Sequence, residues 1–241
     1  MIEFNGQSIS DIAPVKILNV AVSSPKPSVI ARPIARKDGQ VPVYRTNTTR
    51  TVTVTFNLLS QEQEQRVWWI ERLNSWLSPR DERPLTMKKY PEVYLNVICT
   101  GTPDLTLRDW SEVHTIQFTA YDPYFTATHE KTARVNDAFV VTGTQTPKLR
   151  ITFDGGASTI TNARWSHYVG WQLDSVSSFI QIDGAAYASN IEINVPDRIV
   201  RNSNGYLPYT LDSRWFNIAL GRNAIVGTNG AAGTVHWYER Y

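Results

Sequence analysis

The chain has 241 residues, a formal net charge of +2 and one cysteine. This length allows one large or two small domains with a core of normal size. The nearly neutral charge argues against a nucleic-acid binder that depends on a basic stripe. A single cysteine excludes a disulfide framework and a thiolate metal site. Cys99 falls in a strand-like run, where we expect a small buried hydrophobic residue.

The beginning of the chain lacks the basic and apolar regions of a signal peptide. No stretch approaches the ~18 consecutive apolar residues of a membrane span. We therefore expect synthesis and folding in a host cytoplasm, without membrane insertion.

The first fifty residues predict short strands separated by turns. Ile2 to Ser10 is expected to form a strand and a turn, because Asn5-Gly6 is a hairpin signal. Val15 to Val22 alternates loosely and predicts a second strand. Two prolines within Ser23 to Pro27 indicate a loop, and Asp38-Gly39 predicts another hairpin turn.

The segment from Thr51 to Phe56 alternates strictly between threonines and apolar residues. Val52, Val54 and Phe56 share one face of this segment. A period of two is typical of a strand with one buried face. We therefore expect a half-buried strand here.

One prominent helix is expected after this strand. Ser60 and Gln63 have the spacing of a capping box, and Ser78-Pro79 should end the helix because proline disfavours helical geometry in the residue before it. At about 100° per residue, the apolar residues gather on one half of the helix. This predicted buried face consists of Val67, Trp69, Ile70, Leu73, Trp76 and Leu77.

Trp68 falls on the polar side of the same helix. A tryptophan there needs cover, either from a hairpin of the same chain or from another subunit. Because tryptophan is enriched at protein interfaces, Trp68 is a candidate oligomer-interface residue.

The remainder of the chain predicts strands only. Leu85 to Tyr90, Val93 to Thr100 and Glu112 to Phe118 read as strands, and the polar segment from Thr126 to Asp137 as a linker. Beyond it, short alternating runs are separated by turn residues, and no helical period appears. This spacing is typical of a β-sandwich or jelly roll.

No motif in the sequence points to catalysis, a cofactor or a metal. None of the four histidines (His114, His129, His167 and His236) has metal-ligand spacing. The glycine-rich runs do not open a helix, which argues against phosphate binding. Asp104, Asp109 and Glu112 lie close in sequence, but a glycosidase pair is defined by its separation in space. We expect no enzyme, no catalytic or metal-binding residue and no cofactor.

Aromatic residues are common in the second half of the chain. Trp165, Trp171 and Trp215 are candidates for stacking on sugar rings, which would make this half a carbohydrate-binding module. Alternatively, most of these aromatics fill the core between two sheets.

Several segments resemble the distal tail proteins of long-tailed phages and prophages. Phe118 to Phe125 matches the family's closing motif F-x-A/C-x-D-P-Y through Asp122, Pro123 and Tyr124. The segment from Trp215 to Asn223 resembles its G-x-N turn through Gly221 and Asn223, although Leu220 stands where a proline is expected. In Asp122-Pro123, proline fixes the backbone where a strand ends and the aspartate can cap the turn.

The resemblance implies a mainly β protein with one prominent helix and two domains. Residues 1–130 would form a β-sandwich-like ring domain that carries the helix, and residues 131–241 a galectin-like, jelly-roll-like β-sandwich. The protein would be a structural hub of the virion's tail tip or baseplate.

The same resemblance implies the partners. Six copies would close a homo-hexamer, as a single ring or as stacked rings. The ring would join the tail tube protein to a tail-tip or tail-associated protein, with a receptor-binding protein or a cell-surface glycan as a further partner. DNA would pass through the lumen without specific binding.

Overall fold

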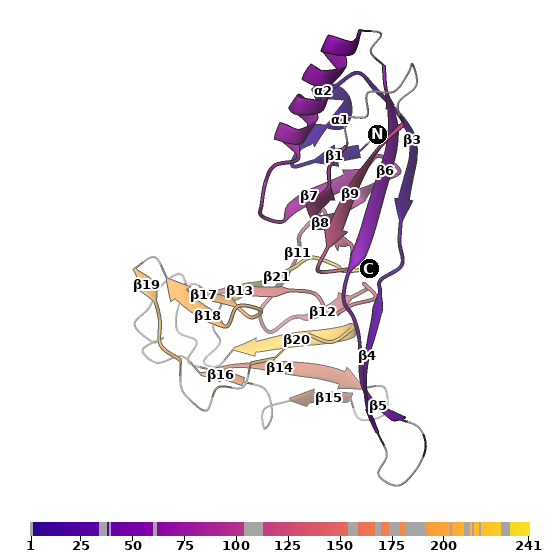
Figure 1. The fold of residues 1–241 in the computed structure, drawn as a ribbon. Coiled ribbons are helices and arrows are strands. Elements are labelled where there is room, and N and C mark those ends of the chain that lie inside the picture. Colours follow the sequence, from indigo (N-terminus) through magenta and orange to yellow (C-terminus); the bar gives the residue numbers. More distant parts are fainter. Residues whose placement is uncertain are drawn as a thin grey trace. The chain divides into compact units, whose positions relative to one another are not determined.

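The protein is described from a computed structural model (Figure 1), which covers residues 2–33, 38, 40–59, 62–103, 113–153, 159–166, 170–173, 179–181, 191–202, 204–209, 213, 215–216, 218–227 and 232–241. For residues 33, 40, 41 and 63, and for the strands between 159 and 181, the backbone alone is described. The chain forms two compact units, Met1–Phe125 and Thr126–Tyr241. The described part is mainly β with two helices, which confirms the expected fold class.

The first unit is built on one antiparallel sheet with the strand order β2-β1-β7-β8-β9-β6-β3. Its strands are β1 (Ile2–Phe4), β2 (Gln7–Ser8), β3 (Val15–Val22), β6 (Arg50–Leu58), β7 (Arg83–Met87), β8 (Tyr90–Gly101) and β9 (Val113–Ala120). The expected turn between β1 and β2 is present. Asn5 and Gly6 have φ angles of 53° and 75°, the left-handed values that a tight hairpin turn requires. A four-residue helix, α1 (Ile9–Ile12), follows β2 and was not expected.

The alternating pattern of β6 is realised as predicted. Val52, Val54 and Phe56 are fully buried, and they lie opposite Phe118, Ile116 and His114 of β9. The intervening threonines lie on the other face of the sheet. The sheet therefore has one apolar face, on which the core of this unit is built.

Helix α2 (Gln63–Trp76) packs on this core through its second half. Ile70, Leu73, Trp76 and Leu77 are buried as expected, and the Trp76 ring meets Phe4 edge-on at 5.6 Å. The prediction for Val67 was wrong, since this side chain is 39% exposed. The helix begins later than the capping box implied, with Glu62 as N-cap; Ser60 lies outside the described residues.

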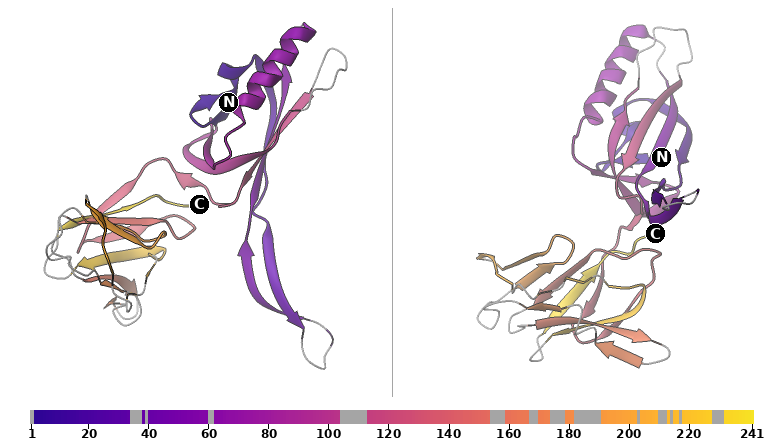
Figure 2. Two further views of the ribbon diagram at one scale, coloured as in Figure 1. Left: turned by 60° about the vertical axis from the view of Figure 1, so that its left-hand side comes forward. Right: turned by 60° about the horizontal axis from the view of Figure 1, so that its bottom comes forward.

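Strands β4 (Pro27–Pro33) and β5 (Gln40–Asn47) form a separate two-stranded sheet, called here the arm (Figure 2). The arm continues the β3–β6 pair. Ser23 donates its amide to Thr51, and Lys26 and Thr48 exchange backbone hydrogen bonds with the opposite strand. The loop predicted from Ser23 to Pro27 is present over residues 23–26, and only Pro27 belongs to β4. Pro27 and Pro33 occupy the ends of this strand, where proline is tolerated.

The second unit contains two antiparallel sheets. The six-stranded sheet has the order β11-β21-β13-β17-β18-β19; the five-stranded sheet has the order β12-β20-β14-β15, with β16 paired to β14. The segment expected as a linker contains β10 and β11 instead. The strands are β10 (Thr126–Ala127), β11 (Lys131–Arg134), β12 (Ala138–Val141), β13 (Leu149–Phe153), β14 (Thr159–Ser166), β15 (Gly170–Leu173), β16 (Phe179–Gln181), β17 (Ile191–Asn194), β18 (Ile199–Asn202), β19 (Gly205–Tyr206), β20 (Gly221–Gly227) and β21 (Gly233–Trp237).

The core of the second unit takes every other residue of its strands. Leu149, Ile151 and Phe153 of β13 are buried, and Ile191 and Ile193 of β17 pair with them. The alternate residues of the six-stranded sheet, polar for the most part, lie on its outer face. Among the C-terminal aromatics, Trp237 belongs to the core, with its ring 4.7 Å from Phe139.

Candidate interaction surface

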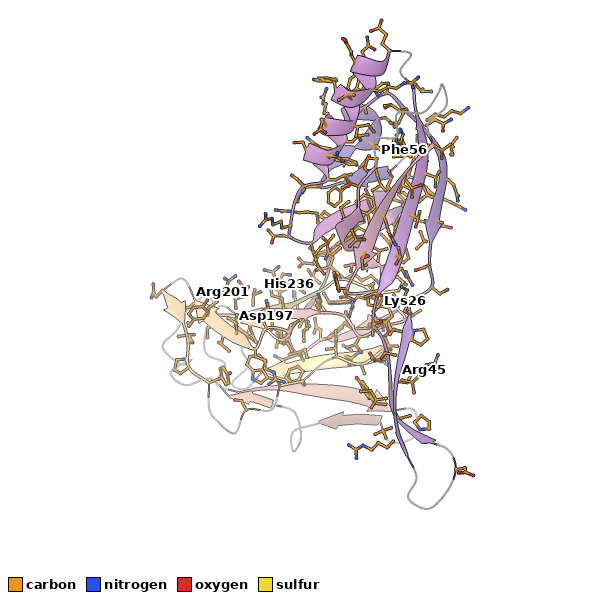
Figure 3. All side chains as sticks on the ribbon, in the orientation of Figure 1. Lys26, Arg45, Phe56, Asp197, Arg201 and His236 are labelled. Carbon is orange, nitrogen blue, oxygen red and sulfur yellow. The ribbon has the colours of Figure 1, made fainter. Side chains whose placement is uncertain are left out.

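The arm exposes apolar side chains on both of its faces. Val29, Ile30, Val43 and Tyr44 are each more than half exposed. Ile30 lies opposite Tyr44, whereas Val29 lies opposite Arg45 and therefore on the other face. Figure 3 labels Lys26 and Arg45 along the arm. A two-stranded hairpin is marginally stable by itself, and exposed apolar patches mark binding surfaces. The arm therefore has the properties of a segment that docks on a partner.

The first half of α2 carries a second exposed group of large side chains. Trp68 is 55% exposed, with its ring 4.3 Å from that of Trp69 at an interplanar angle of 72°. The Arg72 guanidinium lies 5.3 Å from the Trp68 ring centroid and 5.5 Å from that of Trp69. Tryptophan and arginine are the residue types that dominate binding energy at interfaces. Val67 adds further apolar surface here.

The face of the first sheet opposite α2 is polar and uncharged at its centre. Thr51, Thr53 and Thr55 of β6 lie opposite Thr119, Gln117 and Thr115 of β9. Thr100 and Thr119 share a hydroxyl hydrogen bond of 2.9 Å. Exposed strands usually carry charges, whereas β6 and β9 present hydroxyl and amide groups on this face, with Val113 at one end. Lys16 of the neighbouring strand β3 lies on the same face opposite Asn57. We call this surface the threonine face.

The D-P-Y residues lie where the last strand of the first unit ends. Pro123 is buried, and the Tyr124 hydroxyl accepts a hydrogen bond of 3.1 Å from Asn47 Nδ2 at the end of the arm. Arg50 stacks on the next aromatic ring, Phe125, at 4.7 Å. The motif thus ties the end of the first unit to the base of the arm.

The G-x-N segment forms a closed turn. Asn223 is fully buried; its Oδ1 accepts from the Ala219 amide, and its Nδ2 donates to the carbonyls of Ala219 and Gly221 at 2.7 and 3.0 Å. Gly221 has a φ of 91°, a conformation that disfavours residues with a Cβ. This turn has a structural role and starts strand β20.

A buried carboxylate closes the end of the second unit. Glu239 accepts from the amides of Thr142 and Gly143, from Trp237 Nε1 and from Lys131 Nζ, the last at 3.0 Å. Burial, the largest single influence, raises the pKa of this carboxyl, but the hydrogen bonds together hold it below its usual value. We call this group the Glu239 latch. No local sequence pattern reveals it, because its partners lie up to 108 residues away.

A second network lies on the outer face of the six-stranded sheet. Glu130 Oε2 is 3.1 Å from His236 Nδ1, and His236 Nε2 is 3.1 Å from the Thr152 hydroxyl. This order resembles a catalytic triad. However, Arg150 pairs with Glu130 at 3.1 Å, and β13 and β21 each pair with strands on both sides, so their ladder amides are not available for an oxyanion hole. The network therefore holds these charged side chains in fixed positions on the outer face of the sheet and does not form a catalytic site.

The other candidate residues do not form a reactive centre among the residues described. His114 is buried beside Phe56 and His129 is exposed. Cys99 is partly buried beside the core, and burial raises the pKa of its thiol. No group of three or more metal-binding side chains occurs in the described ranges, nor does a helix there have the length and apolarity of a membrane span. His167, Asp104, Asp109 and Glu112 lie outside the described residues.

Of the three tryptophans proposed for sugar stacking, only Trp215 has a described side chain. Trp215 is partly buried against the core and meets Tyr209 edge-on at 5.1 Å. Trp165 and Trp171 are backbone partners in β14 and β15, and their side chains lie outside the described part. Among the described aromatic side chains of this unit, Tyr206 is the most exposed, at 80%.

Comparison with known proteins identifies the fold. No protein-family model matches the sequence, and no curated protein matches it. The crystal structure of the SPP1 Dit protein (gp 19.1), described as a paradigm of the hub adsorption apparatus in phages that infect Gram-positive bacteria, is similar with a TM-score of 0.80 at 18% identity, over 100% of this chain and 98% of that one. A structure of the phage P2 baseplate in its activated conformation with Ca gives a TM-score of 0.51 at 8% identity, over 94% and 91% of the two chains. The chain therefore has the fold of the SPP1 Dit protein over its whole length, as the resemblance implied.

Proposed function

We propose that this protein is a distal tail protein, a structural hub of a phage tail tip that acts by assembly and carries no reactive centre. The observation that carries the proposal is the fold shared with a hub protein over the full chain. The D-P-Y and G-x-N residues add support, because both motifs hold structural positions at the end of one unit and in a turn of the other.

We further propose that the copies close a ring through the first unit. The arm and the Trp68 surface differ from each other, so neither is a self-complementary patch of the kind that makes a two-fold dimer. Contacts between two different surfaces are heterologous, and such contacts generate rings when the rotation closes. From the resemblance to distal tail proteins we propose six copies, as one ring or as stacked rings. Trp68 is the proposed anchor of this contact.

The threonine face is suited to line a passage for DNA. A polyanion binds a surface in proportion to the cations that neutralise its phosphates, and the central strands of this face present none. In a ring with this face inward, DNA would pass without being held. The ring would continue the tail tube protein on one side and meet a tail-tip or tail-associated protein on the other, within the virion. A receptor-binding protein would attach at the rim.

The size of the assembly tests the proposal. Light scattering after gel filtration and electron microscopy should show a hexamer or stacked hexamers, either for the isolated chain or on mixing with the tail tube protein of the same phage. The Ile30→Ser/Tyr44→Ser double variant and Trp68→Ala should each reduce ring formation. Val140→Ser, which alters a half-exposed valine of the second unit, is the matched control. A chain that stays monomeric even with the tube protein would refute the hub.

Carbohydrate binding by the second unit is a second candidate function. The observation that favours it is the polar outer face of the six-stranded sheet, where charged side chains are held in fixed pairs beside the exposed Tyr206.

A further inference from the structure

Two rows of polar side chains cross the outer face of the six-stranded sheet in the second unit. The first row follows directly paired positions across all six strands: Arg134, Thr234, Thr152, Glu192, Arg201 and Tyr206. The second row, two residues along each strand, contains Thr132, His236, Arg150, Asn194 and Ile199. Figure 3 labels Arg201 and His236 on this sheet. We call this surface the polar grid.

The side chains of the polar grid are held in place while remaining accessible to solvent. Glu192 pairs with Arg201 at 2.9 Å, and Glu130 flanks the grid and pairs with Arg150 at 3.1 Å. The arginine side chains are 57% and 41% exposed. His236 links Glu130 to the Thr152 hydroxyl. A guanidinium has five N–H donors and a carboxylate about four acceptor sites, so these pairs leave donors and acceptors for a ligand.

The charges on and beside the polar grid nearly balance. Four arginines, Arg134, Arg150, Arg198 and Arg201, stand against Glu130, Glu192 and Asp197, and Asp197 accepts from Asn194 at 2.6 Å. A surface whose charges nearly balance gives a polyanion little affinity from counterion release. The grid also lacks the apolar centre of a typical protein–protein interface, since Tyr206 and Ile199 are its only large apolar residues among those described. Its hydroxyl, guanidinium and carboxylate groups instead suit a neutral ligand that is rich in hydroxyl groups.

Tyr206 completes a surface of this kind. It ends the first row opposite Arg201 and is 80% exposed, so the described part of the chain leaves its ring uncovered. An aromatic face packs against the C–H face of a sugar ring, while neighbouring polar groups bind the hydroxyls. Strands lie about 4.8 Å apart and alternate residues about 6.6 Å apart, a spacing on the scale of one sugar ring.

We propose that the polar grid binds a neutral oligosaccharide, with Tyr206 as the stacking residue and Arg150, Arg201 and Thr152 among the hydrogen-bonding groups. This site uses other residues than Trp165, Trp171 and Trp215, the sugar-stacking candidates suggested by the sequence. It deepens the second candidate function and is independent of ring assembly.

Binding of the full chain to an array of neutral and anionic oligosaccharides, followed by calorimetry on the best neutral compound, tests this proposal. Tyr206→Ala and Arg150→Gln should each weaken binding at least fivefold, whereas Tyr90→Ala, which removes a half-exposed tyrosine of the first unit, should not change it. If Arg150→Gln unfolds the unit, Tyr206→Ala still tests the proposal, because Tyr206 is 80% exposed and its removal should not destabilise the fold.

Three outcomes would overturn the proposal: no binding to any neutral compound, binding that both grid variants leave unchanged, or binding of anionic glycans only that raised salt abolishes. Gel filtration of the same samples reports ring assembly separately. A result that refutes sugar binding by the polar grid is therefore distinguishable from one that refutes the proposed hub.

Discussion

Removal of the Glu239 carboxylate should destabilise the second unit more than any exposed ion-pair substitution. In Glu239→Ala, the amides of Thr142 and Gly143 and the Trp237 indole N–H lose their acceptor inside the protein. Lys131 loses a partner at 3.0 Å but keeps the Thr142 hydroxyl at 3.2 Å. Lys131 is 46% exposed, so the cost falls on the other donors: a buried donor without an acceptor costs about 1–3 kcal/mol, and for three donors we estimate about 3–5 kcal/mol in total. We expect a loss of that size in the free energy of unfolding.

Calorimetry of the full chain measures this effect. For a unit of about 116 residues, 1 kcal/mol corresponds to about 4 °C in Tm, so the transition of the second unit should fall by about 12–20 °C. None of the described residues of the Glu239 latch belongs to the first unit, so the thermal transition of the first unit serves as an internal reference. Glu192→Ala is the matched control, because its partner Arg201 is 57% exposed and an exposed pair contributes up to about 1 kcal/mol. If Glu239→Ala shifts Tm no more than Glu192→Ala, the latch is not a stabilising element.

Three further predictions concern the second unit. Gly143→Ala should cost about 1–3 kcal/mol, measured by urea unfolding, because the added Cβ would collide with the backbone oxygen of Arg240; wild-type stability would contradict this. The second unit should lose stability in acid. Glu239 and Glu130 have lowered pKa values in the folded protein, since hydrogen bonds outweigh burial. Their contribution is therefore complete above the unfolded pKa of about 4.3 and is lost as pH falls through the folded pKa; thermal scans should show this dependence reduced in Glu239→Gln. Asn223→Ala should lower the free energy of unfolding by about 2–3 kcal/mol, because it removes three hydrogen bonds from a buried turn; a change below about 0.5 kcal/mol would show that the turn closes without it.

Local patterns in the sequence predicted the buried positions that depend only on the geometry of one strand or helix. The period of two in β6 and the buried positions Ile70, Leu73 and Trp76 of α2 follow from the geometry of a single element. Val67 was misassigned because a helical wheel gives an angle about the axis but no position along it. The described contacts of α2 with the core begin at Trp69, so Val67, nearer the start of the helix, stays exposed although its angle is correct.

Local sequence patterns could not predict the arm or the charge networks. The prolines between Ser23 and Pro27 indicated only the loop that precedes the arm, and a two-stranded ribbon has free edges on which proline removes no ladder hydrogen bond. Glu130 meets His236 across 106 positions of the chain, and Glu239 meets Lys131 across 108. These pairs exist only because the strand order brings β11, β21 and β12 to one end of the second unit, and no local periodicity encodes strand order.

Ordering of the arm and assembly of the ring are best understood as one equilibrium. Among the described residues the arm buries no apolar face, so the backbone entropy lost in ordering it, about 1–2 kcal/mol per residue, is offset mainly by the one ladder of hydrogen bonds between β4 and β5. In the proposed ring, contact with a second copy would bury Ile30, Tyr44, Val29 and Val43, at about 1.5–3 kcal/mol for each aliphatic side chain. The arm would then gain most of its stability from the neighbour. A subunit whose docking segment becomes stable only on contact favours a closed ring over free monomers, because closure leaves no arm without a partner.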